Sequence, residues 1–134
     1  MTTRLRDCDD TVAAGRLRKA EQFREAAATI REFADDEAEV GDAFVTLCIH
    51  AGIAAADAVC CKALGHHAQG DDHSQAISEL TKVSPDGKEL SKGLRTLLQL
   101  KPRAEYGPIA VTADQRKRAW RSAERLVEAA RSRR

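Results

Sequence analysis

The segment CIHAGIAAADAVCC, residues 48–61, constrains the fold of this chain more than any other stretch. It is apolar except for His50 and Asp57, and it lies within residues 37–64, which are apolar on most sides. A helix that is hydrophobic all round is buried by other elements. We therefore expect residues 37–64 to form the central helix of the molecule, with Gly65 as its C-cap.

Apolar periodicity and capping signals predict four further helices around this central one. Thr112 and Gln115 form a capping-box pattern, and Trp120 follows as the expected core anchor of the last helix. Pro102 is expected to end the helix before it. The predicted helices cover residues 11–34, a short helix starting at Asp72, a helix from Ser84 and Pro85 to residue 101, and a helix from Thr112 toward the C-terminus.

The composition favours an all-α fold. Hydrophobic residues make up 43% of the 134 residues but aromatic residues only 4%, and Ala, Leu, Glu and Arg are common. A chain of this length fits one domain, and short connections favour antiparallel neighbouring helices. The sequence predicts a single domain, residues 1–134, built as an antiparallel four-helix bundle plus one short helix and ending in a basic tail, residues 131–134.

Charge and cysteine usage suggest a cytoplasmic protein without membrane contact. The net charge is only +1, so an electrostatic partner must recognise a local patch. The N-terminus lacks the apolar core of a signal peptide, and no uncharged apolar run reaches the length of a membrane span. The four cysteines, Cys8, Cys48, Cys60 and Cys61, show no C-x-x-C spacing, and we expect them to be reduced and buried.

A metal site is the obvious alternative for the cysteines and histidines of residues 48–73. Neighbouring side chains such as Cys60 and Cys61 diverge by about 100° on a helix, and no pair has the i, i+4 spacing that lets two side chains chelate one ion. The spacing therefore argues against a metal, and we expect no metal or other cofactor. Zinc sensing stays open as a minor alternative.

His50 and Asp57 are the polar exceptions in the central helix. Seven residues apart, they lie about 20° from alignment on one helix face. A lone buried carboxylate is costly, so Asp57 needs a histidine, an arginine or backbone donors as partners, or a place at a cleft. The pair is either a satisfied polar seam or part of a functional site.

The last helix carries the only strongly basic surface. Residues 112–134 hold eight Lys or Arg against three Asp or Glu, and Arg118, Arg121 and Arg125 align on one face. This face is a candidate nucleic-acid contact, with a solvated surface as the alternative. A Gly-rich phosphate loop, a G-x-S-x-G elbow and an H-E-x-x-H motif are all missing from the sequence.

Three stretches resemble the HEPN family of small helical-bundle proteins. They are the Ala-rich HAGIAAADAVCCKALG, the short helix DDHSQAISEL, and the Leu-rich LLQLKPRAEYG followed by a basic helix. The similarity spans roughly residues 40–130. It implies a homodimer whose relatives are metal-independent ribonucleases or toxins of toxin–antitoxin pairs, or noncatalytic subunits associated with nucleotidyltransferases.

The resemblance also implies a polar groove in which Asp57 faces Arg103, with His50 and Tyr106 nearby. Active members carry a histidine shortly after the arginine, whereas Pro108 or Ile109 stands there in this chain. RNA cleavage needs a proton acceptor and donor besides a cation for the phosphorane, so the missing histidine argues against catalysis.

Besides zinc sensing, these observations leave three functions open. The first is a noncatalytic or weakly active HEPN-like module, dimeric and RNA-associated, paired with an antitoxin or nucleotidyltransferase. The second is a metal-independent endoribonuclease using Arg103, His50, Tyr106 and Asp57. The third is a nucleic-acid-binding regulatory helical protein using the last helix.

Overall fold

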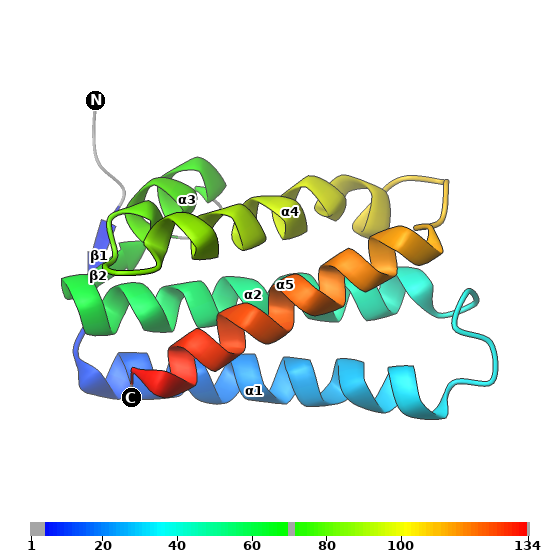
Figure 1. Cartoon of the computed structure of the whole chain (residues 1–134), viewed down its shortest axis with the longest axis horizontal. Coiled ribbons are helices and arrows are strands. Elements are labelled where there is room, and N and C mark those ends of the chain that lie inside the picture. The colour runs from blue at the N-terminus through cyan, green and yellow to red at the C-terminus, as the bar shows by residue number, and fades with distance from the viewer. Residues whose placement is uncertain (1–4, 70–71, 134) are drawn as a thin grey trace.

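The computed structural model describes residues 5–69 and 72–133, and most of them are helical. The all-α class is therefore confirmed in its main feature, although a small antiparallel sheet was not predicted. Of the basic tail, Arg131 and Ser132 belong to the last helix and Arg134 lies outside the described residues. The elements in chain order are β1 (Leu5–Asp7), α1 (Asp10–Phe33), α2 (Gly41–Leu64), β2 (His66–Ala68), α3 (His73–Thr81), α4 (Gly87–Glu105) and α5 (Ala113–Ser132) (Figure 1).

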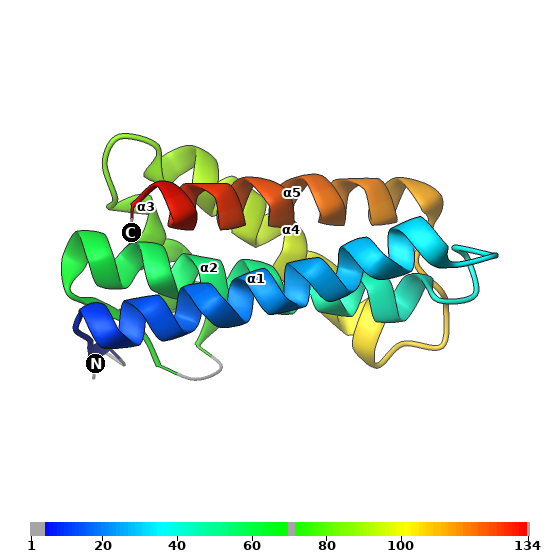
Figure 2. The same ribbon diagram turned by 90° about the horizontal axis from the view of Figure 1, so that it is seen from below.

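The predicted central helix is confirmed as α2, although it begins at Gly41 and not at residue 37. It packs against α1, α4 and α5, and the four long helices lie lengthwise along the molecule (Figures 1 and 2). Side chains such as Val45, Ile49 and Val59 are fully buried. Among the described residues α2 is the one helix long and apolar enough to span a membrane, but 78% of that apolar window is buried inside the molecule. Burial by its neighbours therefore accounts for its hydrophobicity.

Three helix ends are set by the residues that the sequence indicated. Gly65 adopts the left-handed conformation, φ 77°, and its N–H donates to the Cys61 carbonyl. The Asp72 side chain accepts from the Gln75 N–H at the start of α3. Thr112 and Gln115 form the complete capping box of α5.

Both predicted ends of α4 were wrong. The helix begins at Gly87, two residues after Pro85, and it continues through Pro102 to Glu105. A proline in the last turn removes only one helical hydrogen bond, and Leu97 and Leu100 before it are buried. The Pro102 carbonyl then accepts from the N–H groups of both Tyr106 and Gly107, at 3.0 and 2.8 Å, which closes the helix there.

The expectation that all four cysteines are reduced was wrong for two of them. β1 pairs with β2, with Leu5 opposite Ala68, and this places Cys8 at the end of α2 in a disulfide with Cys61. Cys48 and Cys60 are free and buried, as expected. Burial raises the pKa of each of these two thiols to about 12, so both are neutral. The sequence did not show that the pairing of β1 with β2 brings Cys8 to Cys61.

Two glycines inside helices give a matched test of core packing. A Cβ added at Gly52 would lie 2.3 Å from Leu97 Cδ1, whereas at Gly93 the nearest atom would be 3.8 Å away. Alanine is the better helix former at both positions by up to about 1 kcal/mol. We expect Gly52→Ala to lower the free energy of unfolding by about 1 to 3 kcal/mol because it overpacks the α2–α4 contact. Gly93→Ala should be neutral or stabilising in the same urea titration, and equal effects would contradict the packing argument.

The carboxylate of Glu79 fixes α3 to its surroundings. Its side chain is only 1% exposed and lies 2.6 Å from His66 Nε2, and it accepts from Gln75 and Lys82. Burial alone would raise the pKa of Glu79, but the hydrogen bonds from Lys82 and His66 outweigh it and lower the pKa. The charged form is therefore the form that stabilises the folded chain.

This lowered pKa predicts an acid-sensitive contribution to stability. Because the folded-state pKa lies below the unfolded value of about 4.3, the contribution is fully present above that value and is lost as pH falls through the folded-state pKa. We expect Glu79→Gln to lower the free energy of unfolding by about 1 to 3 kcal/mol at neutral pH. Urea titrations should show this difference shrinking below about pH 4. Glu89→Gln, at a surface pair with Lys92, should change little at any pH.

Candidate anion-binding groove

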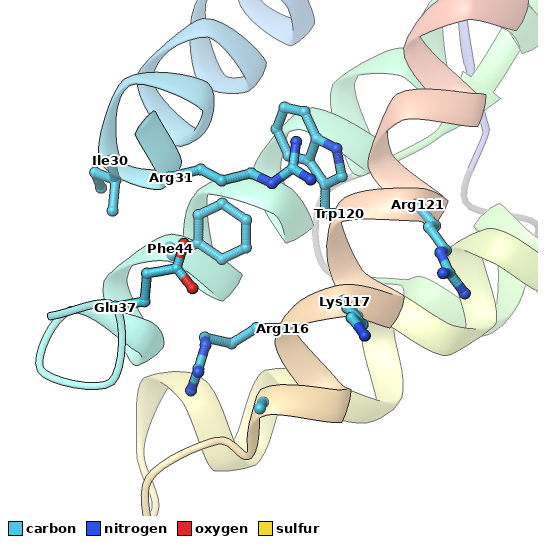
Figure 3. A pocket seen from close by; sticks show the side chains of 9 residues that line it. Ile30, Arg31, Glu37, Phe44, Arg116, Lys117, Trp120 and Arg121 are labelled. Carbon is cyan, nitrogen blue, oxygen red and sulfur yellow. The ribbon is translucent and has the colours of Figure 1, made fainter. Parts of the chain in front are cut away.

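An open groove lies where the end of α1 meets the start of α5 (Figure 3). The last turn of α1, the 34–40 connection, the first turns of α2 and the first three turns of α5 all contribute side chains to it. We call it the Trp120 groove. Its lining residues are Ile30, Arg31, Glu37, Phe44, Ala113, Arg116, Lys117, Trp120 and Arg121.

Two aromatic rings form the apolar part of this groove. Trp120 and Phe44 stack with ring centroids 6.0 Å apart. The Arg31 guanidinium lies 4.8 Å from the centroid of the Trp120 ring, and that of Arg24 lies 5.5 Å from it. Such cation–π contacts hold a guanidinium by its face and leave its in-plane N–H groups available to oxygen acceptors. Arg31 is therefore held in place while its hydrogen-bonding edge stays usable.

The cations of the groove lack acidic partners. Within residues 5–69 and 72–133, Arg31, Arg116, Lys117 and Arg121 form no salt bridge, and their side chains make no hydrogen bond to protein groups. Glu37 is the one carboxylate among the lining residues. Four positive charges thus face one negative charge, which leaves a local positive field around the aromatic rings.

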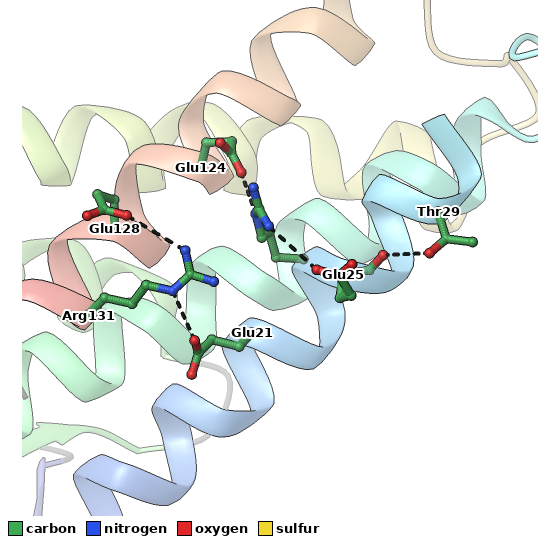
Figure 4. A network of polar contacts seen from close by, with 7 residues as sticks. Glu21, Glu25, Thr29, Glu124, Glu128 and Arg131 are labelled. Carbon is green, nitrogen blue, oxygen red and sulfur yellow. Dashed lines mark hydrogen bonds and ion pairs between the residues drawn. The ribbon is translucent and has the colours of Figure 1, made fainter. Parts of the chain in front are cut away.

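Arginines further along α1 and α5 form ion pairs, unlike the cations of the groove (Figure 4). Arg24 is paired with Glu124 and lies 3.6 Å from Glu25. Arg131 Nε lies 2.9 Å from Glu21 and its Nη1 lies 3.7 Å from Glu128. Two ion pairs, Arg24 with Glu124 and Arg131 with Glu21, therefore join α1 to α5 further along the helices, whereas the four cations of the Trp120 groove have no such partner within the described residues.

This combination of groups suits an anionic ligand. Arginine binds phosphate or carboxylate oxygens through paired N–H donors, and lysine adds a mobile point charge. The lining residues include one carboxylate, Glu37, and no histidine, cysteine or tyrosine that could act with it as an acid or a nucleophile. The geometry is therefore better suited to binding and orienting phosphates or carboxylates than to proton transfer.

The predicted basic face of α5 contributes to the groove through one residue. Arg121 lines it, whereas Arg118 pairs with Asp114 at 3.1 Å on the outer surface. Arg125 is exposed further along the helix. The sequence therefore identified the correct helix and one of the three α5 cations that line the groove.

Asp57 has the arginine partner that its burial requires, but this partner is Arg16. Arg16 Nη2 and Nε lie 2.9 and 3.1 Å from the carboxylate, and His67 Nδ1 lies 3.7 Å from it. Burial raises the pKa of Asp57, and the charge and hydrogen bond of Arg16 offset this only in part. The predicted pairing of Asp57 with Arg103 is wrong.

Arg103 lies at the other end of the molecule. It donates from Nε and Nη2 to the Ala110 carbonyl, and the next residue, Val111, donates to Asp42 in the first turn of α2. Asp57 is 15 residues further along α2, about 22 Å along the helix axis. The polar cluster that the resemblance implied therefore does not form.

His50 and Tyr106, the other two residues of the predicted cluster, do not lie beside an Asp57–Arg103 pair either. His50 packs its ring against Phe23 of α1, with centroids 5.4 Å apart. Tyr106 is 77% exposed at the end of α4. Neither side chain contacts Arg103 or Asp57 through a hydrogen bond within the described residues. The four residues named as candidate catalytic groups therefore do not share one site.

Sequence reasoning missed Arg31, Arg116 and Lys117 as site residues. The sequence predicts Trp120 as a core anchor, but the residue is only partly buried and its ring lines the groove. The spacing of these residues in the sequence could have indicated the site. Arg116 and Trp120 are four residues apart and share one helix face, and Lys117 and Arg121 form the neighbouring pair with the same spacing.

No protein-family model, curated protein or solved structure matches this chain.

Proposed function

We propose that this chain is a noncatalytic, HEPN-like helical module that binds single-stranded RNA through the Trp120 groove. The observation that carries the proposal is the group of four cations without acidic partners around the Trp120 and Phe44 rings. Arg24 and Arg131, which lie further along the contact between α1 and α5, are paired with carboxylates, whereas the four cations of the groove have no acidic partner within the described residues.

Phosphate contacts are the main source of binding in this proposal. Arg31, Arg116 and Arg121 offer paired donors for the oxygens of successive phosphates, and Lys117 adds charge between them. The groove offers little for recognition of the bases, because Arg31 already covers the Trp120 ring on which a base could stack. We therefore expect sequence-independent binding that weakens steeply with salt.

We also propose that the fold is a HEPN-like four-helix bundle with one additional short helix. Packing of α2 against α1, α4 and α5, and of α4 against α5, supports a four-helix bundle with α3 as the extra helix. The helix order agrees with the HEPN resemblance, but the Asp57–Arg103 groove on which that resemblance also rested is not formed. The homodimer and the antitoxin or nucleotidyltransferase partner stay predictions.

Ribonuclease activity is the alternative function, and an RNA cleavage assay distinguishes it from RNA binding alone. Arg103 is bound to a backbone carbonyl, and the two candidate residues of α2 lie apart from it, Asp57 bound to Arg16 and His50 packed against Phe23. An RNA-binding module should leave total RNA intact in the presence of EDTA. Cleavage that disappears in Arg103→Ala would instead establish the ribonuclease.

The binding experiment uses the single tryptophan of the chain as its reporter. A labelled single-stranded RNA is titrated with the protein, following anisotropy of the label and fluorescence of Trp120. Both signals should saturate together, and the logarithm of the association constant should fall linearly with the logarithm of salt concentration, by about 0.7 per phosphate contact. Absence of saturable binding at low salt would refute the proposal, and anisotropy without a Trp120 response would place the RNA outside the groove.

A further inference from the structure

Two cysteines and a histidine from three separate segments of the chain meet at the end of α2. Cys8 follows β1, Cys61 lies in the last turn of α2, and His67 lies in β2. Their ligand atoms all lie within 4.8 Å of one another. The cluster is more than 20 Å along α2 from the turn that carries Phe44 of the Trp120 groove. It is therefore a second feature of the molecule, independent of the proposed RNA site.

The surroundings of His67 leave one ring nitrogen unused. Nδ1 lies 2.7 Å from the Ala68 carbonyl and 3.7 Å from the Asp57 carboxylate. Both neighbours are acceptors, so Nδ1 carries the proton and Nε2 keeps its lone pair. Metal-binding histidines are held in the same way, with the non-ligating nitrogen donating to a carbonyl or a carboxylate.

Other nearby side chains that could bind a metal ion are already bound to protein groups or project away from the cluster. His66 is bound to Glu79, and Asp57 is bound to Arg16. Cys60 precedes Cys61 in the helix and projects about 100° away from it. It is a free, buried thiol and is not in the cluster. Among the described residues, two thiols and one imidazole are thus the ligands available at this end of α2.

We propose that Cys8, Cys61 and His67 bind Zn²⁺ when the two cysteines are reduced, and that formation of the Cys8–Cys61 disulfide releases the ion. Two thiolates and an imidazole are typical zinc ligands, and water completes the tetrahedral coordination. The disulfide form described above is the metal-free state of the same residues.

A small-molecule disulfide can serve as the two-electron oxidant that converts the zinc-bound dithiol into the metal-free Cys8–Cys61 disulfide. The Cys8 thiolate attacks one sulfur of that disulfide and expels a thiolate, giving a mixed disulfide. The Cys61 thiolate then attacks Cys8 Sγ and expels the second thiolate. Two electrons pass from the protein sulfurs to the oxidant, the zinc leaves as Zn²⁺ without a change of oxidation state, and His67 keeps its Nδ1 proton.

The first experiment measures metal binding by the full chain. Protein reduced with a non-chelating phosphine is equilibrated with Zn²⁺ by dialysis, and bound metal is determined by elemental analysis. We expect about one Zn²⁺ per chain in the reduced protein and almost none in the disulfide form. A reduced chain that retains no zinc, or an oxidised chain that retains as much, would overturn the proposal.

Variants assign the ligands. Cys8→Ser and His67→Ala should each weaken Zn²⁺ binding by roughly tenfold or more, since loss of an outer-shell partner alone costs that much at zinc sites. Cys60→Ala is the matched control and should bind like the wild type. Co²⁺ gives a second measurement, because thiolate-to-cobalt absorption should persist in Cys60→Ala and weaken in Cys8→Ser. If Cys60→Ala loses as much affinity as Cys8→Ser, the proposed ligand set is wrong.

A final measurement tests the release step. Adding a small-molecule disulfide to the zinc-loaded chain should free about one Zn²⁺ for each pair of thiols lost, as followed with a zinc indicator and a thiol titration. Circular dichroism of each variant checks that it is folded, and His67→Ala keeps both cysteines, so the ligand test does not depend on one variant. Thiol loss without zinc release would contradict the linkage.

Discussion

Replacing Arg16 by methionine should lower the free energy of unfolding by about 2 to 3 kcal/mol. The Asp57 side chain is 13% exposed and has Arg16 as its principal cation, with Nη2–Oδ2 at 2.9 Å. Removing one partner of a buried ion pair costs about 3 to 5 kcal/mol because the other charge stays uncompensated. The smaller value expected here allows for the 29% exposure of Arg16 and for the nearby His67. Urea titration at neutral pH without reductant, which keeps the Cys8–Cys61 disulfide, measures the effect.

The two sides of this ion pair should not be equivalent. Asp57→Asn removes the group whose charge is costly to bury and leaves Arg16, which can turn toward solvent, so we expect a loss of only about 1 kcal/mol. Arg18→Met is the matched control, because Arg18 is exposed on the same helix and forms no salt bridge within the described residues. It should change stability by less than about 0.5 kcal/mol. If Arg16→Met costs no more than Arg18→Met, the carboxylate of Asp57 does not depend on Arg16.

The need for a partner of Asp57 could be predicted, but its identity could not. A carboxylate in an apolar helix requires a cation or donors wherever the chain places them. Arg16 is 41 residues away in the sequence and lies on another helix. Angular arithmetic relates residues within one helix and says nothing about which face of a neighbour meets it. The choice of Arg103 came from a resemblance, and the fold places that residue at the other end of α2.

Local signals were reliable where the structure depends on local interactions. Gly65 and Thr112 end and begin helices because their own backbone or side chain satisfies nearby groups. The end of α4 depends on packing instead, so the rule that a helix stops before proline placed it too early. Cys8 shows the same limit, since its bond to Cys61 follows from the pairing of β1 with β2.

The Trp120 groove was only partly visible in the sequence for a similar reason. Arg121 was recognised because the basic residues of α5 are close in sequence. Arg31 comes from α1, and its contact with Trp120 depends on how the two helices pack. A tryptophan in an amphipathic helix is usually assigned to the core, and here part of the ring does pack there. The groove forms because Trp120 extends beyond the core to the surface.

Reversing three charges in the Trp120 groove should weaken RNA binding by about a hundredfold. In the triple variant Arg31→Glu, Arg116→Glu and Lys117→Glu, three unpaired cations become carboxylates beside the phosphates. At about 1 kcal/mol for each lost charge-assisted contact the total is about 3 kcal/mol, or roughly a hundredfold in the dissociation constant. The magnitude of the salt slope should also fall by about 2, since three phosphate contacts at about 0.7 each are removed. Anisotropy titrations across a salt series measure both quantities.

A second triple variant separates binding in the groove from a response to net charge. Arg18→Glu, Lys19→Glu and Lys88→Glu change the charge by the same amount at exposed cations that form no salt bridge within the described residues and do not line the groove. Because screening confines the effect of exposed charges to about 10 Å at ordinary ionic strength, this variant should bind RNA within a few-fold of the wild type. Its Trp120 fluorescence should still respond to RNA. Equal losses in the two variants would mean that RNA follows the overall charge of the surface, and the groove would then have no special role.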